Sequence, residues 1–242
     1  MIAVENLSVT YDGRTNAVEK VNFTFEEPSI VGILGPNGAG KSTLIKGMLK
    51  LIPSEGQTYY NDVLLKKVQR KVAYVEQKSA IDYTFPITVK DCVSLGLYPS
   101  GKLFKKISNE DWKKVDNALE KVKMIDFKNK QIGALSGGQF QRVLMARTLV
   151  QQADLIFLDE PFVGIDAVSE KIIMEILFEF RNQGKTIFIV HHDLGKVKDY
   201  FDKLILMNHH LVTYGDTEDV FVDKNLIATY GDSIIVKGGE EK

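Results

Sequence analysis

The chain has 242 residues, a hydrophobic content of 44%, a formal charge of −1 at pH 7, a sequence pI near 6.4 and one cysteine. Its length and apolar content suffice for a substantial core. The balanced charge argues against a nucleic-acid-binding protein, a single cysteine excludes an internal disulfide, and no apolar run approaches the roughly 18 to 20 residues of a membrane-spanning helix. We therefore expect a globular protein of the cytoplasm.

The first segment, from Ala3 to Phe25, alternates apolar and polar residues and predicts two antiparallel strands joined by a turn at 12–16. We expect these strands to form a small β layer against the rest of the domain. Tyr11 directly precedes the turn, where an aromatic side chain can stack on a purine base or pack in the core. The pattern alone leaves both options open.

A buried strand is predicted at Ile30–Leu34, followed by the stretch GPNGAGKST and a helical pattern from Thr43 to Leu51. The stretch fits the P-loop G-x-x-x-x-G-K-[ST], in the required order of strand, loop and helix. Glycines let backbone N–H groups surround phosphate oxygens, Lys41 bridges the terminal phosphates, and Ser42 offers a hydroxyl to Mg²⁺. The predicted site for ATP and Mg²⁺ comprises Gly35, Pro36, Asn37, Gly38, Ala39, Gly40, Lys41, Ser42 and Thr43.

The run AYVEQ predicts the end of another strand, and the amide of Gln77 there is able to ligate Mg²⁺ or water. The region that follows lacks a comparable buried strand, is helical by pattern and has a lysine-rich middle at 102–123, so we interpret it as a helical insert. No linker or repeat marks a second domain. The expected organisation is one nucleotide-binding domain over 1–236, with a core at 1–77 and 151–236, the insert at 78–150 and a tail at 237–242.

The segment LSGGQFQRVLMARTLV starts at Leu135 and places Ser136 at the N-cap of an amphipathic helix, with two glycines at its mouth. A helix N-terminus with bare backbone favours an anion. The chain therefore has a second candidate anion site. Unlike the P-loop, this site has no lysine and no hydroxyl for a metal.

Two further apolar runs end abruptly at polar residues: Leu155–Leu158 precedes Asp159, and Thr186–Val190 precedes His191. Both are typical of buried parallel strands, and a helical pattern at 169–182 separates them. This alternation predicts a doubly wound α/β core with a mostly parallel sheet. With the antiparallel β layer at the N-terminus and the helical insert, the expected fold class is α/β.

Asp159 and Glu160 stand at the carboxyl end of their predicted strand, the edge where α/β proteins bind ligands. Neighbouring side chains of a strand point to opposite faces, so the two acids cannot share one role. We assign Asp159 to holding Mg²⁺ through water, and Glu160 to orienting and polarising the attacking water. The alternative, two solvated acids, is weakened by the P-loop earlier in the chain.

Two histidine pairs follow different patterns. One ring of the pair His191 and His192 is able to reach a γ-phosphate from its strand end, while the other serves packing. Adjacent residues of a strand splay their rings, which makes a poor metal chelate. We expect His209 and His210 to lie in a solvated hairpin turn.

Taken in order, GPNGAGKST, Gln77, LSGGQ, LIFLDE and HHD resemble the motif series of ATP-binding-cassette (ABC) ATPases, over nearly the whole chain. The resemblance implies a homodimer whose two copies pack head to tail, so that LSGGQ of one copy caps the γ-phosphate held by the P-loop of the other. Neither anion site would then be complete alone. It makes Tyr11 the adenine-stacking residue, Gln77 the Q-loop ligand, Glu160 the catalytic base and His192 the switch histidine, and it places Ser136, Gly137, Gly138, Gln139 and Asp166 at the nucleotide.

The loop after LIFLDE departs from the family pattern. It usually reads S-A-L-D and here reads VGID, from Val163 to Asp166. The aspartate is retained, whereas the serine is replaced by Val163. A contact that this serine makes across the dimer therefore has no counterpart here.

A finer resemblance concerns the transported cargo. The stretches IDYTFPITVKDCVSLGLYP, DEPFVGID and IVHHDL are similar to the ATPase subunits of bacterial manganese and zinc importers, with the manganese branch of streptococcus-like bacteria nearest. This implies a membrane permease as partner, a metal-binding surface lipoprotein as indirect partner, and a peripheral position on the inner face of the cell membrane. The surface around Tyr83–Pro99 would dock a permease helix, and manganese, zinc and iron all remain open as cargo.

Two other functions fit parts of the sequence. A cassette ATPase acting on ribosomes or DNA usually has two cassettes in one chain or a long coiled-coil insertion, and this sequence has neither, nor a basic excess. A P-loop kinase for a small molecule leaves LSGGQ unexplained. We therefore expect no nucleic-acid partner, and an ATPase that yields ADP and phosphate.

Overall fold

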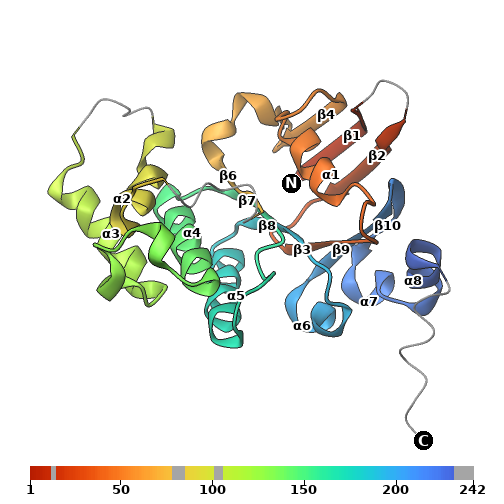
Figure 1. The fold of residues 1–242 in the computed structure, drawn as a ribbon. Coiled ribbons are helices and arrows are strands. Elements are labelled where there is room, and N and C mark those ends of the chain that lie inside the picture. Colours follow the sequence, from red (N-terminus) through yellow and green to blue (C-terminus); the bar gives the residue numbers. More distant parts are fainter. Residues whose placement is uncertain (12–14, 78–84, 101–105, 232–242) are drawn as a thin grey trace, which may run out of the picture. The chain divides into compact units, whose positions relative to one another are not determined.

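The computed structural model describes residues 1–11, 15–77, 85–100 and 106–231 (Figure 1). The chain forms two compact units, which we describe separately. The first unit contains residues 1–69 and 186–242, and the second contains residues 70–185. The P-loop belongs to the first unit, and the LSGGQ segment belongs to the second.

The antiparallel part of the first unit is built on β1 (Ile2–Thr10), which pairs with β2 (Asn16–Phe25) on one side and with β4 (Glu55–Tyr60) on the other. The short β5 (Val63–Leu64) extends this sheet beyond β4. The predicted hairpin between the first two strands is confirmed, although its turn residues 12–14 lie outside the described residues. Helix α1 (Lys41–Met48) lies against these strands, as Figure 1 shows.

The other strands of the first unit are mostly parallel. β3 (Ile30–Leu34) lies between β8 (Thr186–Val190) and β9 (Lys203–Asn208) and is parallel to both. Every residue of β3 and β8 is buried, which explains why both appear in the sequence as uninterrupted apolar runs. β10 (His210–Asp216) returns antiparallel to β9 and meets β2 through the pair His210 and Glu19, joining the two parts of the sheet.

An aromatic cluster packs on this joined sheet. The rings of Phe23 and Phe25 lie 6.2 and 6.1 Å from that of Phe188, and Tyr214 closes the cluster at 6.0 and 5.7 Å from the same two rings. Short helices complete the unit: α6 (Val197–Tyr200), α7 (Thr217–Val220) and α8 (Asp223–Tyr230), with 3-10 turns at Leu65–Lys67 and Leu194–Lys196. The 3-10 turn Gln69–Lys71 spans the boundary in the chain between the two units.

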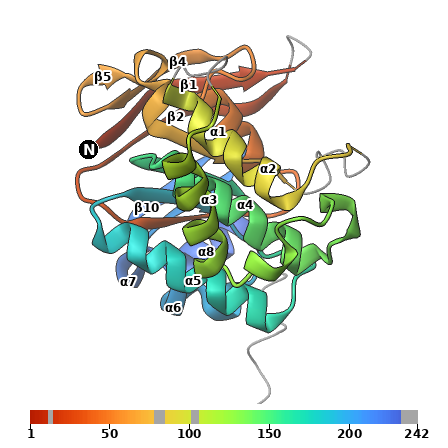
Figure 2. The same ribbon diagram turned by 90° about the vertical axis from the view of Figure 1, so that its left-hand side faces the viewer.

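The second unit combines two parallel strands, β6 (Val72–Val75) and β7 (Leu155–Asp159), with helices α2 (Val89–Ser94), α3 (Asn109–Lys121), α4 (Gly137–Gln151) and α5 (Ala167–Asn182). Helix α4 packs against α2, α3 and α5, as Figure 2 shows for its neighbours α3 and α5. Its buried residues lie around most of its circumference, so the predicted amphipathic pattern is wrong for α4, which is a central helix with neighbours on several sides. Short 3-10 segments at Leu95–Ser100, Ile125–Phe127 and Ile132–Ala134 connect the elements.

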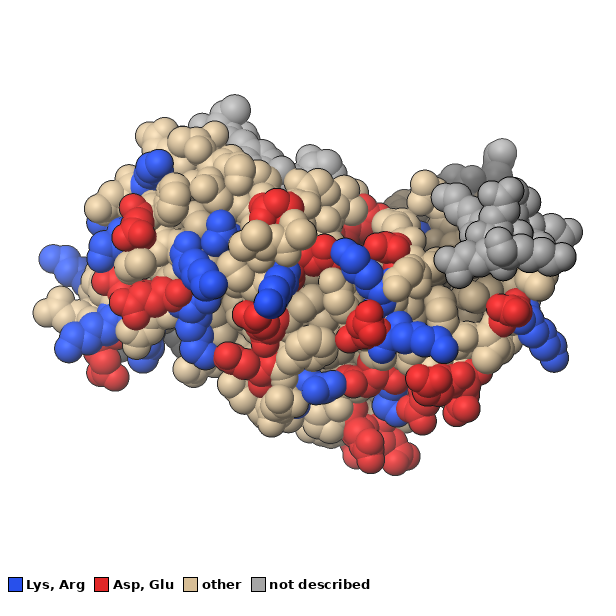
Figure 3. All heavy atoms as spheres, turned by 90° about the horizontal axis from the view of Figure 1, so that it is seen from below, with Lys and Arg blue, Asp and Glu red and all other residues tan. Residues whose placement is uncertain are grey.

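The described part of the chain contains no helix long and apolar enough to cross a membrane. On the face shown in Figure 3, lysine and arginine side chains alternate with aspartate and glutamate, and no continuous basic surface is visible there.

Candidate functional site

The phosphate-binding loop follows the buried strand β3 and forms the bend that leads into α1. Gly38 and Gly40 adopt positive φ angles of 81° and 88°, which glycine tolerates best. A side chain at Gly40 would also collide with the carbonyl oxygen of Ala17. Asn37 and Gly38 are exposed at the tip of the bend, and a Cβ at Gly38 would meet no atom within 4 Å. The loop therefore leaves its backbone accessible where a phosphate would approach.

The ammonium group of Lys41 binds the backbone of this loop. Its Nζ donates to the carbonyl oxygens of Gly35, at 2.9 Å, and Pro36, at 2.7 Å, and the residue is only 5% exposed. The N-cap residue Gly40 supplies no side-chain cap, and the first turn of α1 has no acidic residue, so the helix dipole and the ammonium group both favour an anion at the loop.

The hairpin between β9 and β10 also supports the loop. His209 stands at its turn with a φ of 61°, and its backbone N–H donates to the carbonyl oxygen of Ala39 at 2.9 Å. His209 and His210 are both exposed, as predicted, but only His209 lies in the turn, because His210 is the first residue of β10. The backbone contact to the P-loop was not predicted, because it depends on a tertiary approach that no local pattern signals.

Tyr11 lies beside the same loop. Its hydroxyl is hydrogen-bonded to Oγ1 of Thr43 at 3.0 Å, and the residue is 67% exposed. The side chain is therefore not a core tyrosine. Its ring is available to a base whose phosphates would occupy the P-loop.

The paired histidines after β8 differ sharply in environment. His191 is buried, and its ring contacts those of Tyr200, at 6.1 Å, and Phe201, at 5.4 Å. His192 is exposed. His191 is therefore a packing residue, and the prediction that its neighbour His192 reaches a γ-phosphate stays a prediction.

In the second unit, the strand ends of β6 and β7 bring Gln77 and Glu160 together. Nε2 of Gln77 donates to Oε2 of Glu160 at 2.7 Å. Glu160 has a φ of 51°, a left-handed conformation that is uncommon outside glycine, and is half-buried, whereas Asp159 is only 3% exposed. The two acids therefore occupy different environments, as the alternation of the strand requires.

Tyr74 on β6 belongs to the same acidic neighbourhood. Burial and the nearby charges of Asp159 and Glu76 raise the pKa of its hydroxyl well above the ordinary value, so Tyr74 is neutral at physiological pH. Nothing in the residue pattern distinguished this tyrosine from a core residue.

The LSGGQ segment starts α4 with a capping box. Gln139 N–H donates to the hydroxyl of Ser136 at 3.3 Å, and Ser136 N–H donates to the side-chain oxygen of Gln139 at 3.0 Å. The predicted N-cap role of Ser136 is confirmed. Ser136 and Gln139 use their N–H groups and side-chain oxygens in hydrogen bonds to each other. The accessible backbone N–H groups at the start of α4 therefore include that of the half-buried Gly137.

Asp166 caps the next helix, α5. Its Oδ1 accepts from the N–H of Ser169 at 2.9 Å, and its Oδ2 accepts from the hydroxyl of Ser169 at 2.8 Å. These hydrogen bonds, with a contribution from the charge of Arg142, hold the pKa of Asp166 below its usual value. The cap keeps a negative charge at the exposed start of α5.

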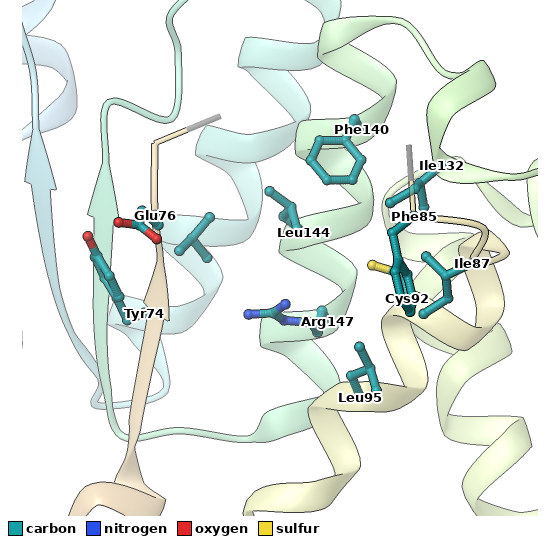
Figure 4. A pocket seen from close by; sticks show the side chains of 11 residues that line it. Tyr74, Glu76, Phe85, Ile87, Cys92, Leu95, Ile132, Phe140, Leu144 and Arg147 are labelled. Carbon is teal, nitrogen blue, oxygen red and sulfur yellow. The ribbon is translucent and has the colours of Figure 1, made fainter. Parts of the chain in front are cut away.

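A cavity of about 510 Å³ lies between β6 and the helices of the second unit (Figure 4). Apolar side chains from α2, α4 and the segments beside them line most of it, and Arg147 on α4 points toward the strand that carries Tyr74 and Glu76. Two apolar lining residues are exposed, Phe85 at 60% and Leu95 at 46%. The first two residues of the predicted docking segment, 83 and 84, lie outside the described residues.

The predicted residues therefore form two groups, one in each unit. Tyr11, the P-loop and the histidines belong to the first unit, and Gln77, Asp159, Glu160, the LSGGQ segment and Asp166 belong to the second. Ser169, Tyr74 and the backbone of His209 are contacts that sequence reasoning missed.

Comparisons with known proteins place the chain in a family. The family model described as ABC transporter matches residues 18–163. The manganese transport system ATP-binding protein MntB of Listeria monocytogenes is 47% identical over 95% of this chain and 96% of its own length, and the MntB protein of Bacillus subtilis is 39% identical over 99% of both chains.

Solved structures show the same fold. An inward-facing structure described as a metal-chelate type ABC transporter has a TM-score of 0.81 at 26% identity, covering 94% of this chain and 88% of its own. A dimeric ATP-binding cassette with ADP and Pi has a TM-score of 0.77 at 28% identity, covering 89% and 98%. The chain belongs to the ABC transporter family.

Proposed function

We propose that this chain is the ATP-hydrolysing subunit of a bacterial ABC importer for a divalent metal ion, with manganese as the cargo. Relatives named for manganese transport, at 39% and 47% identity over nearly the whole chain, support this cargo, and zinc and iron are the alternatives. The single observation that carries the ATPase role is the pair of anion sites, a P-loop with a buried lysine and a separate capped helix entrance without one.

The P-loop has the chemistry that a triphosphate requires. Lys41 is held inside the bend, the tip at Asn37 and Gly38 is open, and the start of α1 adds positive potential. Mg²⁺ bound there would help to neutralise the negative charge of the phosphates. The donor set fits this ion, because hydroxyl, amide and carboxylate oxygens are the ligands that Mg²⁺ prefers; we assign these to Ser42, Gln77 and Asp159.

Glu160 is the proposed catalytic base and Gln77 its partner. The 2.7 Å hydrogen bond from the Gln77 amide orients the carboxylate of Glu160, which would accept a proton from the attacking water. His192, exposed at the end of β8, would donate to the γ-phosphate, and Tyr11 would stack on the adenine.

The LSGGQ segment is proposed to bind the nucleotide held by a second copy of the chain. Its helix entrance offers backbone N–H groups but no lysine and no hydroxyl for a metal, which suits a clamp on a nucleotide that is already bound elsewhere. Ser136, Gly137, Gly138 and Gln139, with Asp166, would form this clamp. ATP thus holds the two copies together, and hydrolysis releases them.

The remaining partners are a membrane permease and, indirectly, a metal-binding surface lipoprotein. The cavity of the second unit supports the permease contact, since its exposed apolar residues Phe85 and Leu95 and the charged Arg147 would receive an amphipathic segment. The protein would then lie in the cytoplasm, on the inner face of the cell membrane.

The decisive test is Glu160→Gln, which preserves the shape of the side chain and removes its charge. We expect this variant to bind ATP, to accumulate as a dimer and to lose about 10² to 10³ in turnover, the scale of one positioned catalytic group. Glu175→Gln, at an exposed position of α5, is the matched control and should behave like the wild type. Wild-type turnover in Glu160→Gln, or a strict monomer with bound ATP, contradicts the proposal.

A further inference from the structure

In the second unit, the LSGGQ segment at the start of α4 contacts the loop that carries Asp166, and the contact is made at Gly138. This glycine of the LSGGQ segment is buried, and a Cβ there would collide with Oδ2 of Asp166 and lie 2.5 Å from Oγ of Ser169. The absence of a side chain at Gly138 therefore lets the start of α5 pack directly on the start of α4. The contact joins the LSGGQ segment to the loop that carries Asp166.

Ser169 determines where the Asp166 carboxylate lies in this contact. The N–H of Ser169 binds Oδ1, as in an ordinary helix cap, and its hydroxyl binds Oδ2, the oxygen nearest to Gly138. Capping alone needs only the first bond. The second bond prevents the carboxylate from rotating away, and Ser169 itself is 0% exposed, so its own position is fixed by packing.

We propose that Ser169 is a positioning residue of the ATPase: its hydroxyl holds the Asp166 carboxylate against Gly138, so that the LSGGQ entrance and the Asp166 loop present one preformed surface to the nucleotide of the second copy. This rests on the proposed function, in which both segments bind across a dimer. The family resemblance places Asp166 and Gly138 at the nucleotide, but it assigns no role to Ser169.

The first experiment compares Ser169→Ala with Ser94→Ala. Ser94 is also a buried serine of the second unit, and its hydroxyl donates to the carbonyl oxygen of Asp91 at 2.7 Å, so it controls for the loss of a buried hydrogen bond. We expect Ser169→Ala to lower kcat about ten- to a hundredfold, the scale of a hydrogen bond to a charged group, and to weaken ATP-driven dimerisation in the Glu160→Gln background similarly. ATP binding by the monomer should stay unchanged in both variants.

A double-mutant cycle tests whether Ser169 acts through Asp166. Asp166→Asn keeps a side-chain oxygen for the cap but loses the carboxylate that the hydroxyl holds. If Ser169 works through this carboxylate, Ser169→Ala should reduce kcat little further in the Asp166→Asn background. Additive losses would overturn the proposal.

The outcomes also separate this inference from the function on which it rests. A Ser169→Ala variant that only melts at a lower temperature, with wild-type kcat and dimerisation, has lost a structural contact and overturns the positioning role. Equal losses of kcat in Ser169→Ala and Ser94→Ala overturn it as well. If Glu160→Gln itself fails to dimerise with ATP, the failure belongs to the proposed function, and the cycle on kcat alone then decides the role of Ser169.

Discussion

Gln77 and Glu160, 83 residues apart in the chain, are joined by a hydrogen bond of 2.7 Å from amide to carboxylate. Each follows a strand of the parallel pair formed by β6 and β7, whose register places Val75 opposite Leu158. The parallel pairing thus carries both residues to one edge of the sheet. A change at Gln77 should therefore alter the behaviour of Glu160 without touching the P-loop.

The first prediction is that Gln77→Glu shifts the pH dependence of turnover. The substitution keeps the size of the side chain but places two carboxylates at hydrogen-bond distance, where both cannot readily carry a charge. One of them must hold a proton, so the acidic limb of the kcat profile should move to higher pH. Gln131→Glu, at an exposed position of the same unit, is the control. A profile for Gln77→Glu that overlays the wild type would exclude the coupling.

The second prediction concerns Lys41. Lys41→Met keeps most of the aliphatic stem but removes the ammonium group that binds the carbonyl oxygens of Gly35 and Pro36. ATP would lose the charge-assisted contact between this ammonium group and its phosphates, about 1.5 to 3 kcal/mol, so binding should weaken at least tenfold in calorimetry. Lys67→Met, an exposed lysine of the same unit, should leave the affinity unchanged. Unaltered ATP affinity in Lys41→Met would remove the P-loop assignment.

The third prediction separates the ring of Tyr11 from its hydroxyl. Tyr11→Phe loses the hydrogen bond to Thr43 but keeps the aromatic face, whereas Tyr11→Ala loses both. If the ring stacks on adenine, Tyr11→Ala should lose about 1 to 3 kcal/mol of nucleotide affinity and Tyr11→Phe much less. Neither should greatly lower the melting temperature, because the side chain is 67% exposed. Equal affinities for the two variants would mean that the ring makes no contact with the base.

Much of the fold was predictable because burial leaves a direct signature in the sequence. β3 and β8 occupy the predicted ranges Ile30–Leu34 and Thr186–Val190, since both strands are buried on both faces and end at a residue of different chemistry. The α/β class and the family resemblance are confirmed by the related structures and proteins. Helix α1 begins at Lys41, two residues before the predicted start, because Gly40 provides the N-cap.

The parts that escaped prediction depend on distant partners. β4 has the sequence EGQTYY, whose polar residues give no strand signal, and it forms because β1 offers an open edge. The contact of Gly138 with Asp166 and Ser169 depends on the packing of α4 on α5, and a motif cannot show it.

The fourth prediction concerns pH and the charge of Asp166. The pKa of its carboxyl is lowered in the fold, first by the hydrogen bond from the backbone N–H of Ser169, then by that from the Ser169 hydroxyl. A lowered pKa stabilises the fold above the unfolded value of about 3.9 and loses that contribution as the pH falls through the folded value. At pH 7, Asp166→Asn should therefore unfold at a lower urea concentration than the wild type. The difference between the two unfolding midpoints should become smaller below about pH 4.

Asp126→Asn removes an exposed carboxylate of the same unit and serves as the control for the urea series. If the difference in urea midpoint between the wild type and Asp166→Asn stays constant from pH 7 to pH 3, the charge of Asp166 does not contribute to its capping of α5.

The last prediction concerns the cavity of the second unit. Phe85 is 60% exposed at the edge of this cavity and is not one of the residues proposed to bind ATP or to catalyse its hydrolysis. Phe85→Ser should therefore leave the basal ATPase rate of the isolated subunit near that of the wild type. In proteoliposomes with the permease, the same variant should lose stimulation by the permease and metal uptake, because aromatic side chains often contribute much of the binding energy of a docking surface. Val222→Ser, an equally simple loss of an exposed apolar side chain from the other unit, is the control. Normal uptake by Phe85→Ser would place the permease contact elsewhere, while a fall in the basal rate would show that the cavity supports the catalytic groups directly.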